Sequence, residues 1–139
     1  MLLKGKRIFI VEDNMQNRVI FQMSFIRHGA VIDFERRGRE TVARLNEISD
    51  VDLIVLDLML AEGVSGFDLF DEIRAVPKFA TVPIVAVSAM DPGLAIPKTL
   101  SKGFSGFIAK PIDNHLFPKQ IAKIIEGEAV WYAGDRNWV

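Results

Sequence analysis

The chain has 139 residues, of which 50% are hydrophobic and 25% charged, and this composition excludes a disordered or fibrous protein. Its formal net charge of −1 gives no electrostatic reason to expect binding to nucleic acid or to an anionic membrane. The absence of cysteine excludes disulfides and thiolate chemistry and is compatible with a cytoplasmic location. Lysine and arginine interrupt the first apolar run, so we expect neither a signal peptide nor a membrane anchor.

Short apolar runs alternate with longer segments of helical periodicity, a pattern typical of βα units around a parallel sheet. Five units fit within a length usual for one domain. The predicted strands are 7–11, 31–34, 53–57, 83–87 and 106–109, and the predicted helices lie within 14–29, 38–48, 66–76, 94–102 and 118–126. The sequence therefore predicts an α/β domain with a parallel sheet.

The first helix is predicted from Val19, Met23 and Ile26, which recur at helical spacing between the N-cap Asn14 and the terminating Gly29. In the last helix, Pro118 suits the first turn, where its missing N–H costs nothing. The apolar residues expected on the other helices are Val42, Leu45 and Ile48 in the second, Leu69, Phe70 and Ile73 in the third, and Ile121, Ile124 and Ile125 in the last.

Polar residues follow four of the five predicted strands at the point where each strand ends. They are Glu12 and Asp13 after the first strand, Asp57 at the end of the third, Ser88 after the fourth and Lys110 after the fifth. In a parallel α/β sheet the carboxyl ends of the strands meet at one edge, where ligands gather. Each residue alone has an ordinary explanation as a helix cap or a solvated loop residue. Their joint placement favours a functional site.

The residue types in this set suit phosphoryl transfer. Three neighbouring carboxylates repel one another unless a cation lies between them, and an oxygen-only donor set suits Mg²⁺. Lys110 and Ser88 would, together with the metal, neutralise the oxygens of a transferring phosphoryl group. Asp57 is central among these residues and is placed as the nucleophile.

The motifs FIVEDN, LIVLDLML, VSGFDLF, IVAVSAMD and GFIAKPI resemble those of receiver domains of two-component response regulators, in the same order and at the same spacing. The resemblance covers residues 5–126. It implies a flavodoxin-like, doubly wound, five-stranded parallel sheet in a three-layer (βα)5 sandwich. It also implies that a histidine kinase or a histidine phosphotransfer protein donates a phosphoryl group to Asp57 with Mg²⁺. The stretch EDNMQNR further resembles receivers attached to hybrid kinases.

The same resemblance implies roles for single residues in the metal site. Asp13 would bind the metal directly, Glu12 mostly through water, and Met59 through its backbone carbonyl. The loop after Asp57 departs from the usual pattern, because Ala61 stands where a proline is common and one extra residue precedes Gly66.

The resemblance also implies a switch. Ser88 and Lys110 would hold the phosphoryl oxygens, and Phe107 would be the aromatic residue that swings inward as Ser88 moves toward the phosphate. Output is then expected through contact with a downstream protein near the fourth helix and fifth strand, because the 13 residues after 126 are too few for an effector domain.

Other functions remain open at this stage. A haloacid-dehalogenase-type phosphatase also uses a strand-end aspartate with Mg²⁺, but it needs a second aspartate where Met59 stands. A pseudo-receiver would keep the fold as a binding module without phosphorylation, and the retained acids, Ser88 and Lys110 count against it. An intermediate phosphate shuttle in a phosphorelay would use the same site as a terminal regulator. In each reading that keeps the receiver chemistry, the chain is a signalling module rather than an enzyme that turns over a substrate.

The last segment, residues 128–139, is set apart from a receiver domain at 1–127 by its aromatic residues. Disordered tails tend to lack aromatic residues, whereas this one carries Val130, Trp131, Tyr132, Trp138 and Val139. We expect the extension to pack on a protein surface, either on its own domain beside the last helix or on a partner subunit of a homodimer.

Overall fold

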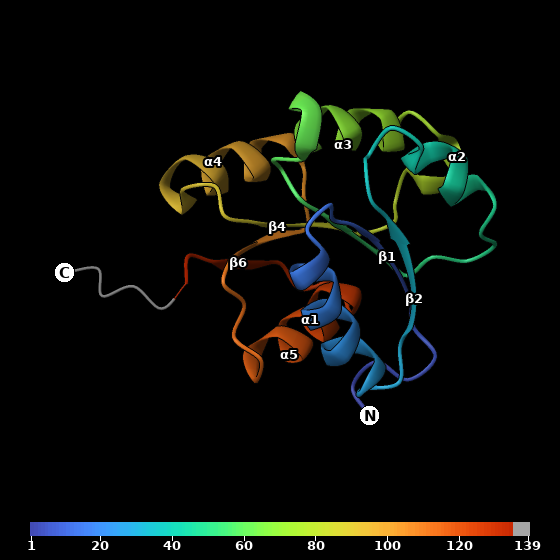
Figure 1. Cartoon of the computed structure of the whole chain (residues 1–139), viewed down its shortest axis with the longest axis vertical. Helices are drawn as coiled ribbons and strands as arrows, with labels where there is room; N and C mark the ends of the chain where they lie inside the picture. Colours follow the sequence, from blue (N-terminus) through green and yellow to red (C-terminus); the bar gives the residue numbers. More distant parts are fainter. Residues whose placement is uncertain (135–139) are drawn as a thin grey trace.

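The structure is a computed structural model and describes residues 1–134. A parallel sheet lies between two layers of helices, with α2, α3 and α4 on one face and α1 and α5 on the other (Figure 1). The helices are α1 (Met15–Ile26), α2 (Thr41–Asn46), α3 (Gly66–Arg74), α4 (Pro92–Lys102) and α5 (Leu116–Ile125). This three-layer arrangement is the one expected from alternating strands and helices.

The sheet has the strand order β2-β1-β3-β4-β5-β6, and every neighbouring pair is parallel. The strands are β1 (Arg7–Val11), β2 (Val31–Glu35), β3 (Leu53–Leu56), β4 (Ile84–Ser88), β5 (Gly106–Ala109) and β6 (Val130–Tyr132). The predicted flavodoxin-like, doubly wound fold is therefore confirmed. The sheet has six strands where five were predicted, because β6 is too short to show a periodicity in the sequence.

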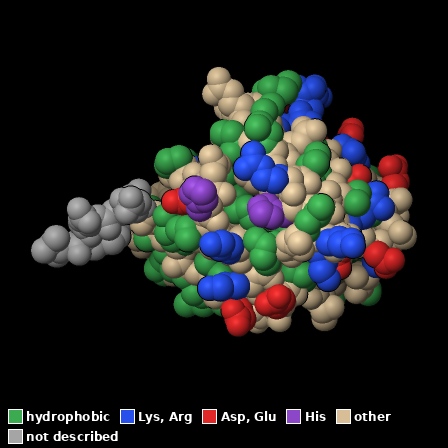
Figure 2. Space-filling model, turned by 90° about the horizontal axis from the view of Figure 1, so that it is seen from below, with side chains coloured by type: hydrophobic (Ala, Val, Ile, Leu, Met, Phe, Trp, Pro, Cys, Tyr) green, Lys and Arg blue, Asp and Glu red, His purple; other side chains and the backbone are tan. Residues whose placement is uncertain are grey.

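Helix α1 begins where predicted, since the Asn14 side chain accepts a hydrogen bond from the Asn17 backbone N–H at 3.0 Å. The three residues whose spacing predicts this helix, however, do not face the core. Val19, Met23 and Ile26 are about half exposed. Figure 2 shows the molecule from below, the side on which α1 lies in Figure 1, and on this face hydrophobic side chains are mixed with lysine and arginine. The periodicity found the helix, and the buried side is formed instead by its neighbours Phe21, Ser24 and Phe25.

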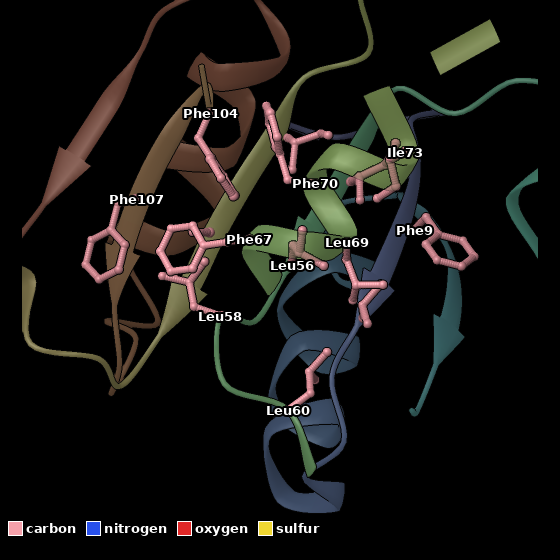
Figure 3. Packing of buried hydrophobic residues seen from close by; sticks show 14 of the residues in the cluster. Phe9, Leu56, Leu58, Leu60, Phe67, Leu69, Phe70, Ile73, Phe104 and Phe107 are labelled. Atoms are coloured by element: carbon pink, nitrogen blue, oxygen red, sulfur yellow. The ribbon is translucent and has the colours of Figure 1, made fainter. Parts of the chain in front are cut away.

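The core divides into two clusters, one on each face of the sheet. Successive residues of a strand point to opposite faces. Leu56 and Phe107 therefore join the cluster under α2, α3 and α4 (Figure 3), whereas Val55 and Ile108 join the cluster under α1 and α5. Because both faces are covered, the central strands read as continuous apolar runs. A charged residue directly after such a strand is held at a fixed position on the sheet edge.

The loop after β3 accommodates its extra residue with a short 3-10 helix, Ala61–Gly63, in which Glu62 and Gly63 have positive φ angles of 60° and 74°. Gly66 then begins α3 in direct contact with the end of β3. A Cβ atom on Gly66 would lie 2.2 Å from the Asp57 carbonyl oxygen, so only glycine fits there. The start of α3 is thereby packed against the backbone of Asp57.

The first part of the aromatic extension packs on the chain's own domain, which is one of the two surfaces expected for it. Val130–Tyr132 form β6 and pair with β5 beside α5. Trp138 and Val139 lie outside the described residues. Among residues 1–134, no helix is long and apolar enough to cross a membrane.

Candidate functional site

Three carboxylates lie together at the carboxyl edge of the sheet. Glu12 and Asp13 follow β1, and Asp57 follows β3, the next strand in the sheet. One oxygen of each carboxylate lies within 4.8 Å of an oxygen of each of the others. Glu12 and Asp57 are buried and Asp13 is partly exposed, so the cluster opens to solvent on the Asp13 side.

Lys110 binds two of these three carboxylates. Its Nζ lies 2.6 Å from Oε1 of Glu12 and 2.9 Å from Oδ2 of Asp57. The lysine follows β5, so one side chain spans from one end of the site to the other. Its exposed fraction is only 13%, which keeps both ion pairs largely out of water.

Burial and the ion pairs have opposite effects on Glu12 and Lys110. Burial disfavours the charged form of each group, and the ion pairs favour it. Burial raises the pKa of Glu12, and the hydrogen bond from Lys110 offsets only part of this effect. For Lys110, burial disfavours the ammonium form, but the charges of Asp57 and Glu12 outweigh burial and raise its pKa. The ammonium therefore stays charged at neutral pH, while one positive charge faces three carboxylates.

Backbone N–H groups fix the orientation of the functional side chains. The Met59 N–H donates to Oδ1 of Asp57 at 3.1 Å, and the Met90 N–H donates to Oγ of Ser88 at 3.2 Å. In the same way, the Ala61 N–H donates to Oδ2 of Asp13 at 2.6 Å. Met59 and Met90 lie two residues beyond the side chains that they hold, whereas Ala61 reaches Asp13 from the loop after β3, and Oδ2 of Asp57 is left to Lys110.

Ser88 and Phe107 lie on the neighbouring strands β4 and β5. Ser88 is fully buried at the end of β4, where its carbonyl accepts a hydrogen bond from the Lys110 N–H at 2.9 Å. Phe107 is fully buried in the cluster under α2, α3 and α4, and its Cα partners in the sheet are Ala86 and Trp131. The structure shows the aromatic ring in the inward position.

Sequence reasoning missed the contribution of the β2–α2 loop. Glu35, buried at the end of β2, accepts hydrogen bonds from Oγ1 of Thr41 at 3.0 Å and from the Arg37 N–H at 2.9 Å. This holds Arg36 and Arg37 at a shallow pocket that Asp13 also lines. The sequence does carry a signal for this contribution, because Glu35 is an acidic residue directly after the predicted strand 31–34.

Comparison with known proteins agrees with this geometry. The sequence profile of the response regulator receiver domain matches residues 8–122, and the chain belongs to this family. The two-component response regulator ORR12 of rice is 26% identical over 110 residues, which cover 79% of this chain and 90% of the relative. The probable histidine kinase 5 of rice is 24% identical over 148 residues, but this chain spans only 12% of that protein.

A solved structure points to the same family. The receiver domain of sensor histidine kinase PA1611 from Pseudomonas aeruginosa has a TM-score of 0.76 and 27% identity, covering 88% of this chain and 99% of that one. That structure holds a magnesium ion in its active-site cleft. The resemblance drawn from the sequence motifs is therefore confirmed at the level of the family: the chain is a receiver domain of the two-component type.

The acid cluster of this chain fits a divalent cation of the same kind. Its donors are all carboxylate oxygens, which suit Mg²⁺ better than zinc or copper, and the side open to solvent leaves room for water ligands. One ammonium against three carboxylates leaves negative charge that such a cation would neutralise.

We predict that Lys110→Met, which keeps an unbranched side chain one atom shorter and removes its charge, lowers the free energy of unfolding in magnesium-free buffer by about 3 kcal/mol, because two buried carboxylates lose their common partner. Urea denaturation measures the change. Millimolar Mg²⁺ should recover much of the loss by replacing the missing positive charge.

The matched control is Lys102→Met, which breaks an exposed ion pair between α4 and Asp71 of α3, outside the acid cluster. We expect it to change the stability by no more than about 1 kcal/mol. A Lys110→Met protein whose stability loss is the same with and without Mg²⁺ would show that the uncompensated charge is not its cause.

Proposed function

We propose that this chain is a cytoplasmic response regulator receiver that accepts a phosphoryl group from phosphohistidine onto Asp57 and signals through contact with another protein. One observation carries the proposal: β3, which Asp57 follows, lies in the sheet between β1, which precedes Glu12 and Asp13, and β5, which precedes Lys110, and the Asp57 carboxylate is held by Lys110 and by the Met59 N–H. Glu12 also contacts Lys110, but it follows β1 and does not have this central position. Asp57 combines the central position with the contact to Lys110 and two neighbouring acids, so Asp57 is the acceptor.

In the reaction, an Asp57 oxygen forms the new bond to phosphorus as the bond from phosphorus to the donor's histidine nitrogen breaks, and the electron pair returns to the imidazole. Lys110 supplies positive charge to the phosphoryl oxygens and orients the Asp57 carboxylate through its ion pair. A Mg²⁺ ion held by Glu12, Asp13, Asp57 and the Met59 carbonyl would supply the remaining charge neutralisation. Arg36 and Arg37 flank the open side, where the phosphoryl group must enter.

Ser88 and Phe107 are proposed to transmit the change. In the structure, the Ser88 hydroxyl oxygen accepts a hydrogen bond from the Met90 N–H. A phosphoryl group on Asp57 would offer a charged acceptor to the Ser88 hydroxyl proton, and hydrogen bonds to charged acceptors are strong. Movement of Ser88 changes the space next to Phe107 on the adjacent strand. The inward position of Phe107 is then the position that phosphorylation favours.

An intermediate shuttle in a phosphorelay is the second candidate, and the similarity to receivers that form part of histidine kinases favours it. The chemistry at Asp57 is the same in both. A shuttle would return its phosphoryl group to a histidine phosphotransfer protein, whereas a terminal regulator would keep it while binding a downstream protein.

We predict that wild-type protein incubated with Mg²⁺ and acetyl phosphate gains a mass of about 80 Da, the mass of one phosphoryl group, and that Asp57→Asn gains none. Intact-protein mass spectrometry measures the adduct. Asp68→Asn, which changes an exposed aspartate on α3, is the matched control and should be labelled like the wild type. Labelling that persists in Asp57→Asn would refute the assignment of the acceptor.

We further predict that the phosphorylated form decays slowly. Hydrolysis needs a water molecule aligned for attack on phosphorus, and Met59 and Met90, two residues beyond Asp57 and Ser88, flank that path. Thioether groups are poor hydrogen-bonding groups and cannot orient the water. Combining Met59→Asn with Met90→Glu should accelerate the loss of the 80 Da adduct by about tenfold or more, in the range that one positioned polar group contributes to a reaction. An unchanged or slower decay would show that water positioning is not limiting.

A protein donor must contact the surface around Asp57, and the exposed face of α1 is the apolar surface that adjoins it. Helix α1 starts two residues after Asp13 and exposes Met15, Val19, Ile20, Met23 and Ile26. A pocket between α1 and the loop from β5 to α5 is lined by Ile20, Phe21 and Lys110 itself, so this apolar surface continues into the site. We propose that the phosphohistidine donor docks here with an apolar helical surface of its own.

Met23→Glu should therefore lower the rate of phosphotransfer from a histidine phosphotransfer protein by about tenfold or more, because it places a charge at the centre of the contact. Labelling by acetyl phosphate should stay unchanged, because this small donor needs no docking surface. Leu94→Glu is the matched control, since Leu94 is equally apolar and also exposed but lies on α4. If Met23→Glu and Leu94→Glu transfer at the wild-type rate, the donor docks elsewhere.

A further inference from the structure

We propose that Trp131, in the C-terminal strand β6, is a positioning residue that holds Phe107 inward and thereby couples the C-terminal extension to phosphorylation of Asp57. This inference rests on the proposed function, because it gives that site an additional element of control. It concerns residues 127–134, which lie beyond the part of the chain that matches the family.

Trp131 lies beside Phe107 in the sheet. In the register between β5 and β6, Gly106 pairs with Val130, Phe107 with Trp131, and Ile108 with Tyr132. Trp131 packs against the same core cluster as Phe107, whereas Val130 and Tyr132 pack against the cluster on the opposite face. Trp131 is thus the residue of β6 that shares a face with the switch aromatic.

The position of Trp131 closes the open flank of Phe107. On its other side, Phe107 has Ala86 of β4, the next strand toward the centre of the sheet. Without β6, strand β5 would be the edge of the sheet, and the ring of Phe107 could leave the core across that edge. With β6 in place, the ring must displace Trp131 to leave, so docking of β6 favours the inward position.

Gly106 shows that β5 is built to receive β6. A Cβ atom at position 106 would lie 2.5 Å from the Val130 carbonyl oxygen and 3.3 Å from the Val130 nitrogen. An alanine at this position would therefore collide with the backbone of β6 while contacting only a movable methyl group of Ile124 at 3.2 Å on its own domain. Gly106→Ala is consequently a change directed at the docking of β6.

The docked strand is also suited to detach. It has three residues, all of them half-buried, and it pairs on one side only. The chain passes from α5 to β6 through Gly127, whose φ angle of 100° allows a reversal of direction in a single turn. Short, half-buried segments with few backbone hydrogen bonds open at a low cost in free energy. Small changes at Phe107 can therefore shift the docking equilibrium of β6.

The coupling must be reciprocal. If phosphorylation favours inward Phe107, and inward Phe107 favours docked Trp131, then the docked strand raises the affinity of Asp57 for a phosphoryl group by the same factor. The extension then acts as a built-in ligand of the switch, and a partner that removes β6 from β5 lowers the population of the signalling state.

The first experiment uses Trp138→Phe, in which Trp131 is the single tryptophan of the chain. Beryllium fluoride with Mg²⁺ serves as a stable mimic of the phosphoryl group, and acrylamide quenching reports the exposure of Trp131. We expect quenching to fall when the mimic binds, and to stay unchanged when Asp57→Asn is added to this background. Quenching that does not change although the mimic binds would overturn the proposal.

The second experiment measures the affinity for beryllium fluoride by calorimetry in variants of the intact chain. Trp131→Ala and Gly106→Ala should each weaken binding by about fivefold or more, in the range of coupling between linked sites. Trp131→Phe should restore most of the affinity. Tyr132→Ala is the matched control, because it removes an aromatic residue of the same strand from the opposite face.

The outcomes separate this inference from the proposed function. If wild-type protein neither binds beryllium fluoride nor gains a phosphoryl group, the proposed function fails. If it does both, but Trp131→Ala binds the mimic within twofold of wild type or no more weakly than Tyr132→Ala, the coupling through Trp131 is refuted while the function stands. The coupling would likewise be refuted if Trp131→Ala and Tyr132→Ala lowered the melting temperature equally and did not differ in their affinity for beryllium fluoride.

Discussion

The site depends on one ammonium group shared by two buried carboxylates. Lys110 reaches Glu12 and Asp57 at 2.6 and 2.9 Å in a part of the molecule from which water is largely excluded, so removing it would leave two buried carboxylates without their common partner. The positive charge of Lys110 neutralises the carboxylates only in part, because Asp13 adds a third carboxylate nearby. A remaining negative charge that is held in place by the fold, and open on one side, is what makes the site receptive to a divalent cation and then to a phosphoryl group.

The sheet gives that charge cluster its precision. Strands β1, β3 and β5 are buried on both faces, so the residue that follows each of them has little freedom to shift along or across the edge. Gly66 adds a second constraint, because its missing side chain lets α3 pack directly on the Asp57 backbone. The acceptor is therefore fixed from behind by apolar packing and in front by Lys110 and the Met59 N–H.

Sequence reasoning succeeded where a residue's place follows from a period or from a strand end, and failed where it depends on a partner that the pattern does not contain. The apolar runs located five strands, and strand ends brought Glu12, Asp57 and Lys110 together. Helical spacing alone does not say which side of a helix is buried, so the exposed side of α1 could not be recognised. Strand β6 is defined by its pairing with β5, and its three residues are too few to show a strand periodicity in the sequence.

The exposed apolar face of α1 and the C-terminal strand β6 lie on different parts of the molecule and suit different tasks. The exposed apolar face of α1 adjoins the entrance to the acid cluster, where a donor must present its phosphoryl group. Strand β6 lies at the opposite end of the sheet order from β2 and covers Phe107. A donor on α1 would therefore leave β6 accessible. Receiving a phosphoryl group and reporting its presence need not compete for one surface, and the short strand at the edge adds a point at which a second partner can act on the same equilibrium.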